Sequence, residues 1–130
     1  MRLLLDTHIF LWFITADERL PSMTQVAIRD TSNEVYLSVV SVWEVVVKYQ
    51  LGKLPLPEAP ERYIPRQREL HQIASLALDE HSVSFLPQLP VLHRDPFDRM
   101  LICQALASGS TMMTHDENVR TYPVPLFPKS

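Results

Sequence analysis

The chain has 130 residues, 46% hydrophobic and 21% charged, with a net charge of −3, which predicts one globular domain over residues 1–130. The negative charge argues against a general nucleic-acid coat protein, although an acidic site can meet a nucleic acid through bound cations. The apolar runs fall short of the roughly 20 residues that cross a bilayer, and one cysteine excludes an internal disulfide, so we expect a cytoplasmic protein without a membrane partner.

In chain order, the first half of the sequence alternates strand-like and helix-like runs. Apolar continuity, helical periodicity and β-branched content predict a strand at 2–6, helices at 8–15 and 22–30, a strand at 35–40 and a helix at 41–51. Ser22 begins a capping box after Pro21, which opens the second of these helices. Ser41 and Gly52 mark the start and the end of the third helix.

A proline-rich loop at 53–60 precedes the second half. The same criteria predict a helix at 61–72, a strand at 75–79, a short helical piece, a helix at 96–108 and a strand at 110–116. Gly109 ends the long helix, and the prolines of the tail leave room only for a short edge strand. Strands separated by helices indicate βαβ crossovers. The predicted fold class is therefore α/β, a single compact domain with a mostly parallel central sheet flanked by helices.

Four acidic residues lie near the carboxyl ends of the predicted strands, where open parallel sheets bind their ligands. Asp6 ends the first strand and Asp116 ends the last one. Glu44 follows the second strand by one helix turn, and Asp98 opens the helix that leads to the last strand. Four carboxylates at one sheet edge would repel each other unless cations lay among them. Mg²⁺ or Mn²⁺ suits such an oxygen ligand set, and a pair of ions can activate water for phosphodiester hydrolysis.

Each acid also has a purely structural alternative. Asp6 is equally well placed as a turn residue, and Asp116 as a turn residue or a helix cap. Glu44 could close a capping box with Ser41 and pair with Lys48 one helix turn later. From the residues alone, these alternatives stay open.

The segment HRDPFDRM, residues 93–100, separates two roles more clearly. Asp95 precedes Pro96 and is well placed as an N-cap, with proline at the first helical position. Asp98 shares a helix face with the apolar Leu101 and Ile102, and a carboxylate pointed inward is costly without a partner. We therefore predict that Asp95 caps the helix and that Asp98 is a metal ligand.

Four stretches of the chain, LLLDTHIFLW, SVVSVWEVVVKYQLGKL, HRDPFDRMLICQALA and TMMTHDENVRTYPV, together resemble the PIN domain family. More narrowly, they resemble the VapC-type toxin ribonucleases of toxin–antitoxin operons, nearly from end to end. The resemblance implies a compact α/β fold whose acidic cluster binds Mg²⁺ or Mn²⁺ and hydrolyses RNA. By motif position, it places the catalytic and metal-binding acids on Asp6, Glu44, Asp98 and Asp116. Thr7 and Thr114 take supporting positions, whereas the pattern leaves open the roles of the nearby acids Asp95 and Glu117. We count Asp95 as a supporting residue of the site.

The resemblance further implies a homodimer and a cognate antitoxin protein that binds in or beside the acidic groove. Trp12, Phe13 and Trp43 lie in apolar segments and are candidates either for such contacts or for the core. Residues that could guide RNA to an acidic site are Lys48, Lys53, Arg62, Arg66, Arg68, Arg94 and Arg99. Two alternative functions are a catalytically silent PIN-like binding module and a magnesium-dependent phosphatase. The latter commonly has a second Asp two residues after the first, where this chain has His8.

Overall fold

The computed structural model describes residues 1–129, whose strands form one parallel sheet in the order β3-β2-β1-β4. The strands are β1 (Arg2–Leu5), β2 (Glu34–Ser38), β3 (Ala74–Leu76) and β4 (Thr111–Met113). The helices are α1 (Thr7–Ile14), α2 (Ser22–Arg29), α3 (Val39–Gln50), α4 (Pro60–Leu70), α5 (Glu80–Val83), the 3-10 turn η1 (Leu86–Gln88), α6 (Pro96–Ser108) and α7 (Glu117–Arg120). The predicted α/β class with a parallel sheet flanked by helices is confirmed.

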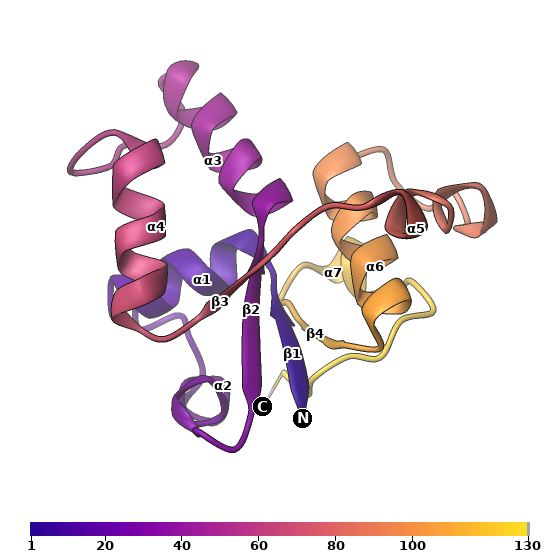
Figure 1. The fold of residues 1–130 in the computed structure, drawn as a ribbon, viewed down its shortest axis with the longest axis horizontal. Coiled ribbons are helices and arrows are strands. Elements are labelled where there is room, and N and C mark those ends of the chain that lie inside the picture. Colours follow the sequence, from indigo (N-terminus) through magenta and orange to yellow (C-terminus); the bar gives the residue numbers. More distant parts are fainter. Residues whose placement is uncertain (130) are drawn as a thin grey trace.

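Two helical layers cover the two faces of this sheet, as Figure 1 shows. Leu3 and Leu5 of β1 point into a core shared with α1, α2 and α4, while Leu4 points into a core shared with α6 and α7. Successive side chains of a strand point to opposite faces, so a strand covered on both sides is apolar at every position. All three leucines are fully buried, which explains the unbroken apolar run in the sequence.

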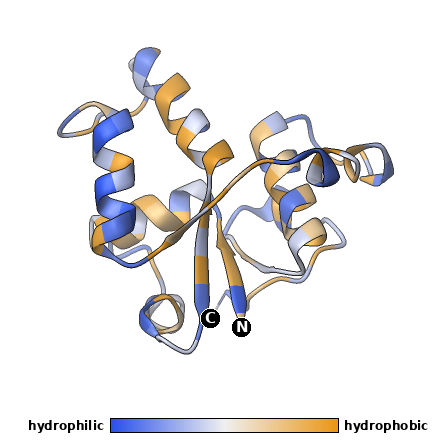
Figure 2. Cartoon of the chain, in the orientation of Figure 1, coloured by the Kyte–Doolittle hydropathy of each residue, from blue (hydrophilic) through white to orange (hydrophobic). Residues whose placement is uncertain are grey.

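The hydropathy of the chain follows these layers. In Figure 2, β1 is hydrophobic along most of its length, whereas α4 is largely hydrophilic and buries Ile64 on its inner side. The longest helix of the described chain is α6, with 13 residues. Within residues 1–129, no helix is both long and apolar enough to cross a membrane.

The start of α3 differs from the prediction in a way that matters for the site. β2 ends at Ser38, whose hydroxyl accepts a hydrogen bond from the Val40 amide (2.9 Å) and caps the helix. The predicted strand end at residue 40 and the predicted helix start at Ser41 are therefore each wrong by two residues. Ser41 lies inside α3 and is buried, so the capping box of Ser41 with Glu44 does not form.

Other boundaries also shift by a few residues. Ser22 is the first residue of α2 and Pro21 is its N-cap without a side-chain hydrogen bond, so the predicted capping box is wrong. β3 and β4 are shorter than predicted because Asp79 and Asp116 leave the sheet and cap the short helices α5 and α7. The expected edge pairing of the tail is present as a parallel bridge of Leu126 to Met112.

We predict that Ser38→Ala lowers the free energy of unfolding by about 1–3 kcal/mol, since it removes an N-cap and a buried partner. The Ser38 hydroxyl donates to Gln104 Oε1 (2.5 Å), and Gln104 Nε2 donates to the Ala77 carbonyl (3.2 Å), so the loss reaches three segments. Urea denaturation measures the difference. Ser22→Ala is the matched control and should change stability by less than about 0.5 kcal/mol. Equal losses in the two variants would show that Ser38 is not the helix cap.

Candidate metal centre

Three strands end together at one edge of the sheet, and acidic or hydroxyl side chains follow each of them. Asp6 follows β1, α3 with Glu44 follows β2, and Thr114 follows β4. In Figure 1 this is the end of β1 and β2 at which α1 and α3 begin. Because β1 lies between β2 and β4, Asp6 lies between Glu44, which follows β2, and Thr114, which follows β4.

Asp6 is buried and both of its carboxylate oxygens are held. Its side chain caps α1, with Oδ1 accepting from the His8 amide (2.9 Å), and Oδ2 accepts from the Thr114 hydroxyl (2.7 Å). Burial raises the pKa of Asp6, and the charge of Glu44 adds to this, while the bonds from Thr114 and His8 oppose it. Asp6 is thus a desolvated carboxyl group that needs compensation by positive charge.

Glu44 is only 2% exposed and lies on the first turns of α3. Oε1 accepts from the Thr7 hydroxyl (2.7 Å), and Oε2 accepts from Lys48 Nζ (2.5 Å). Ser41 Oγ lies 2.9 Å from the same Thr7 hydroxyl, so the residue expected to begin the helix instead helps to fix Glu44. Although partial burial opposes it, the hydrogen bond and charge of Glu44 raise the pKa of Lys48.

Asp98, the third residue of α6, reaches the same region with a side chain that is 13% exposed. Its Oδ2 lies 3.3 Å from His93 Nε2. Burial raises the pKa of Asp98 to about 8, and the negative charges of Asp95, Asp6, Glu44 and Asp116 contribute in that order. The acids predicted from the strand ends therefore act on one another within one electrostatic field.

Asp95 and Asp116 have a different setting from the buried acids. Asp95 caps α6 by accepting from the Phe97 and Asp98 amides (2.9 and 3.1 Å), which confirms the predicted cap. Asp116 is exposed and caps α7, so its structural alternative is realised, although its charge still raises the pKa of Asp98. Glu117 pairs with Lys129 and its pKa is lowered by that contact, so it contributes little to the acidic field.

Sequence reasoning missed His93, which the structure fixes beside Asp98. Its Nδ1 lies 2.8 Å from the Tyr122 hydroxyl, which also accepts hydrogen bonds from the His93 amide (3.1 Å) and from Arg99 (3.0 Å). Tyr122 is nearly fully buried, so the imidazole is anchored on the side away from Asp98. The five-residue spacing of His93 and Asp98 was visible in the sequence, but Tyr122 is 29 residues away.

The donor chemistry of this cluster fits Mg²⁺ or Mn²⁺, which prefer carboxylate oxygen. In their present conformations, no three His, Cys, Asp or Glu side chains within residues 1–129 converge closely enough to hold an ion. Each acid is instead engaged by a donor of the protein, with Lys48 on Glu44 as the one full positive charge. The raised pKa values of Asp6 and Asp98 indicate a site that is short of positive charge. A divalent ion would meet this need once the side chains reorient.

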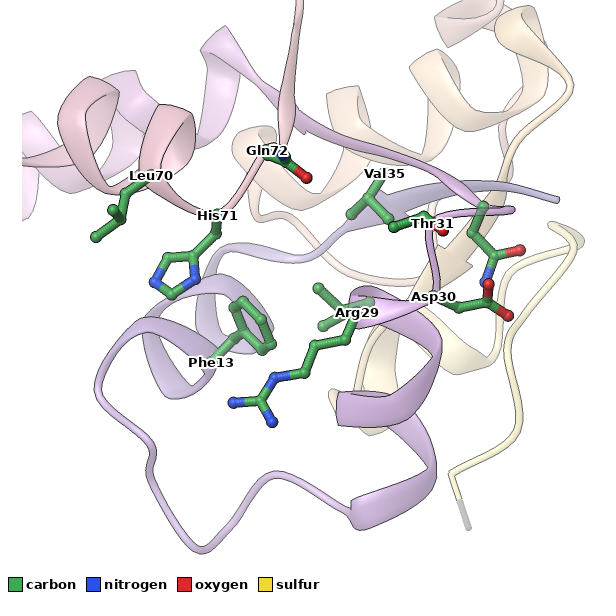
Figure 3. A pocket seen from close by; sticks show the side chains of 10 residues that line it. Phe13, Arg29, Asp30, Thr31, Val35, Leu70, His71 and Gln72 are labelled. Atoms are coloured by element: carbon green, nitrogen blue, oxygen red, sulfur yellow. The ribbon is translucent and has the colours of Figure 1, made fainter.

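A separate cavity of about 290 Å³ lies near the ends of α1, α2 and α4 and the start of β2 (Figure 3). Phe13 stands between the His71 ring, edge-on at 5.0 Å, and the Arg29 guanidinium at 5.9 Å. Its only lining carboxylate among the described residues is Asp30, whose Oδ1 already accepts from Ser32. This cavity does not contain the acidic cluster.

The fold and its acidic edge define an α/β domain with a carboxylate cluster at the carboxyl ends of parallel strands. Residues 3–124 match the PIN domain, and the chain belongs to the PIN domain family. A stretch of 56 residues is 36% identical to Ribonuclease VapC16 of Mycobacterium tuberculosis. That match covers 43% of this chain and 40% of the relative, so it spans less than half of either protein.

Solved structures of similar fold extend over nearly the whole chain. VapBC2 from Rickettsia felis, bound to a DNA fragment from its promoter, gives a TM-score of 0.69 at 14% identity over 98% of both chains. DNA-bound VapBC from Salmonella typhimurium gives 0.67 at 18% identity over 98% of this chain and 97% of the other. FitAcB from Neisseria gonorrhoeae gives 0.64 at 20% identity, with the same coverage. At these identities the likeness establishes the fold.

We predict that Asp98→Asn stabilises the protein at pH 8 in EDTA, by an amount on the order of several kcal/mol at most. The raised pKa means that a proton on Asp98 favours the folded state, so the parent loses stability as the pH rises from roughly 4, where an unfolded Asp titrates, to about 8. Asn is neutral throughout and keeps a polar group beside His93. The advantage of the variant, measured by denaturation at several pH values, should therefore vanish towards pH 4.

Asp95→Asn is the matched control for this experiment, because Asn caps a helix about as well as Asp. Because the charge of Asp95 also raises the pKa of Asp98, this variant should gain part of the stability at pH 8, but less than Asp98→Asn gains. If Asp98 merely complemented the dipole of α6, Asp98→Asn would instead lose about 0.3–1 kcal/mol at pH 8. That loss would contradict a place for Asp98 in a repelling carboxylate cluster.

Proposed function

We propose that this protein is a divalent-metal-dependent endoribonuclease of the VapC type, the toxin of a toxin–antitoxin pair. The observation that carries the proposal is the set of mutually repelling carboxylates at the sheet edge, where the pKa of Asp98 rises to about 8. A protein that gathers buried acids in this way gains most from binding a multivalent cation. The partial similarity to Ribonuclease VapC16 supports RNA as the substrate.

In this proposal, Asp6, Glu44, Asp98 and Asp116 would hold Mg²⁺ or Mn²⁺. The metal, when bound, would activate a water molecule and stabilise the charge that develops on the phosphodiester. Thr114 orients Asp6 and Thr7 orients Glu44 through the hydroxyl bonds of 2.7 Å that each carboxylate accepts. Asp95 supports the site by fixing the first turn of α6, from which Asp98 projects.

The proposed partners are RNA, a cognate antitoxin protein and a second copy of this chain. The structural relatives include VapBC complexes, in keeping with an antitoxin partner. Phe13 is buried in the core, so it is removed from the candidates for such contacts. Trp43 is 57% exposed and packs edge-on against Phe97 at 4.8 Å, which leaves it available on the surface beside Glu44.

We predict that the protein cleaves single-stranded RNA with Mn²⁺ or Mg²⁺ and not in excess EDTA. Asp6→Asn should abolish cleavage while the circular dichroism spectrum stays that of the parent, because Asn retains the size and the cap of Asp6 but not its charge. Asp79→Asn is the matched control: Asp79 also follows a strand and caps a helix, yet it lies outside the cluster. This variant should cleave like the parent.

The same assay separates the alternatives. Cleavage that persists in EDTA would contradict a metal-dependent mechanism. Hydrolysis of a generic phosphomonoester without RNA cleavage would favour the phosphatase, and binding without any hydrolysis would favour a silent module. Single-stranded DNA, tested in parallel, reports whether the activity is confined to RNA.

We further predict that Mn²⁺ stabilises the folded protein, because the unfolded chain has no acidic cluster. At 100 times its dissociation constant, the ion should add about 2.7 kcal/mol to the free energy of unfolding. Thermal melts with a Mn²⁺ titration measure the effect. Asp6→Asn and Asp98→Asn should lose most of the increase, and Asp79→Asn should keep it. A melting temperature that is independent of Mn²⁺ in the parent would argue against these residues as ligands.

A further inference from the structure

A cavity of about 230 Å³ opens directly beside the carboxylate cluster, between α1, α3 and the segment that follows α3. One part of its wall is polar and basic, with Lys48, Lys53, His8 and Thr7, and the other part is apolar, with Leu11, Val45 and Leu54. Lys48 and Thr7 are also the residues that bind Glu44. The cavity and the acidic cluster therefore share a wall.

The end of α3 brings the two lysines together. Gly52 has a positive φ of 70°, its amide donates to the Tyr49 carbonyl (3.0 Å), and the Lys53 amide donates to the Lys48 carbonyl (2.9 Å). These two bonds are those of a Schellman motif, in which the residue after the glycine folds back over the last helix turn. In such motifs the residue after the glycine often makes an apolar contact with the residue that accepts its hydrogen bond. Here these residues are Lys53 and Lys48, so both are lysine.

Of the two lysines that line the cavity, one has a carboxylate partner. Lys48 has its counter-charge in Glu44, at 2.5 Å. Lys53 has no ion pair within residues 1–129, and the exposed His8 imidazole stands on the same wall. The cavity thus has one cation without a carboxylate partner among the described residues, with an imidazole on the same wall. An anion bound there would have Lys53 as its counter-ion.

We propose that this cavity binds a backbone phosphate of the RNA strand next to the one that is cleaved, with Lys53 as its principal cation. This inference rests on the proposed function, since it names where the substrate chain continues beyond the metal centre. The apolar residues Leu11 and Leu54 would pack against the sugar or base of the same nucleotide. A chain of net charge −3 needs such a local cationic site to hold a polyanion near its carboxylates.

The test compares Lys53→Gln with the parent in two measurements on single-stranded RNA. With Mn²⁺, the variant should raise KM several-fold and leave kcat unchanged, because a phosphate held away from the reacting bond contributes uniform binding. With EDTA, binding of a labelled oligoribonucleotide should weaken, and the slope of log K against log salt should fall by about 0.7, the value for one phosphate contact on a single strand. Lys53 is exposed, so folding should not suffer.

Two further variants sharpen the result. Lys53→Arg should restore KM and the salt slope, since arginine also binds phosphate. Arg2→Gln removes an equal charge at the start of β1, at the opposite end of that strand from Asp6 and the cavity, and should change neither quantity. An effect of Arg2→Gln equal to that of Lys53→Gln would overturn the proposal, because only net charge would then matter. Unchanged KM, binding and salt slope in Lys53→Gln would also overturn it.

These outcomes separate the cavity from the proposed function. If the parent binds RNA through Lys53 without cleaving it, the phosphate site stands and the nuclease proposal fails. If the parent cleaves RNA and Lys53→Gln behaves like the parent, the nuclease proposal stands and the phosphate site fails.

Discussion

Repulsion among the buried carboxylates shapes the whole carboxyl end of the sheet. Asp6 and Glu44 are at most 4% exposed, so water does little to screen their charges from each other or from Asp98. Each acid consequently has a polar partner of its own: Thr114 donates to Asp6, Thr7 and Lys48 donate to Glu44, and the His93 imidazole lies 3.3 Å from Asp98. Most of these donors are neutral, so they satisfy hydrogen bonds while leaving the negative charge of the cluster in place. The carboxylates of this centre therefore have hydrogen-bond partners, but most of their negative charge is not neutralised by positive groups of the protein.

The topology of the sheet explains how distant residues supply these donors. With β1 between β2 and β4, groups that follow all three strands must meet around Asp6, although Thr114 is 108 residues away from it. The three buried leucines of β1 lock that strand between two cores, so Asp6 has no freedom to withdraw from its neighbours. The fold therefore enforces the closeness of the acids, and the energy of core packing offsets the electrostatic cost.

How much of this arrangement the sequence predicts depends on the range of each interaction. The cap of α6 by Asp95 rests on neighbouring residues and was predicted correctly, as was the parallel sheet. The capping box predicted at Ser41 is an equally local pattern, yet it does not form. β2 ends at Ser38, which caps α3 in place of Ser41, and the Ser41 hydroxyl contacts Thr7, 34 residues away. Ser38 was hidden because its second partner, Gln104, is distant in the chain. Local chemistry predicts a cap only where no tertiary partner competes for it.

Lys48 connects the acidic centre with the basic cavity, and its position explains why both can exist in one small domain. Its ammonium group compensates Glu44, yet the same residue lines the cavity that Lys53 and His8 face. If a divalent ion took over the charge of Glu44, Lys48 would become free to act on an anion in the cavity. Binding of the metal to Glu44 would then favour binding of phosphate, because Lys48 would be free to contact it. By the same coupling, bound phosphate would favour binding of the metal. The acidic cluster and the basic cavity at this edge of the sheet are thus electrostatically coupled through Lys48.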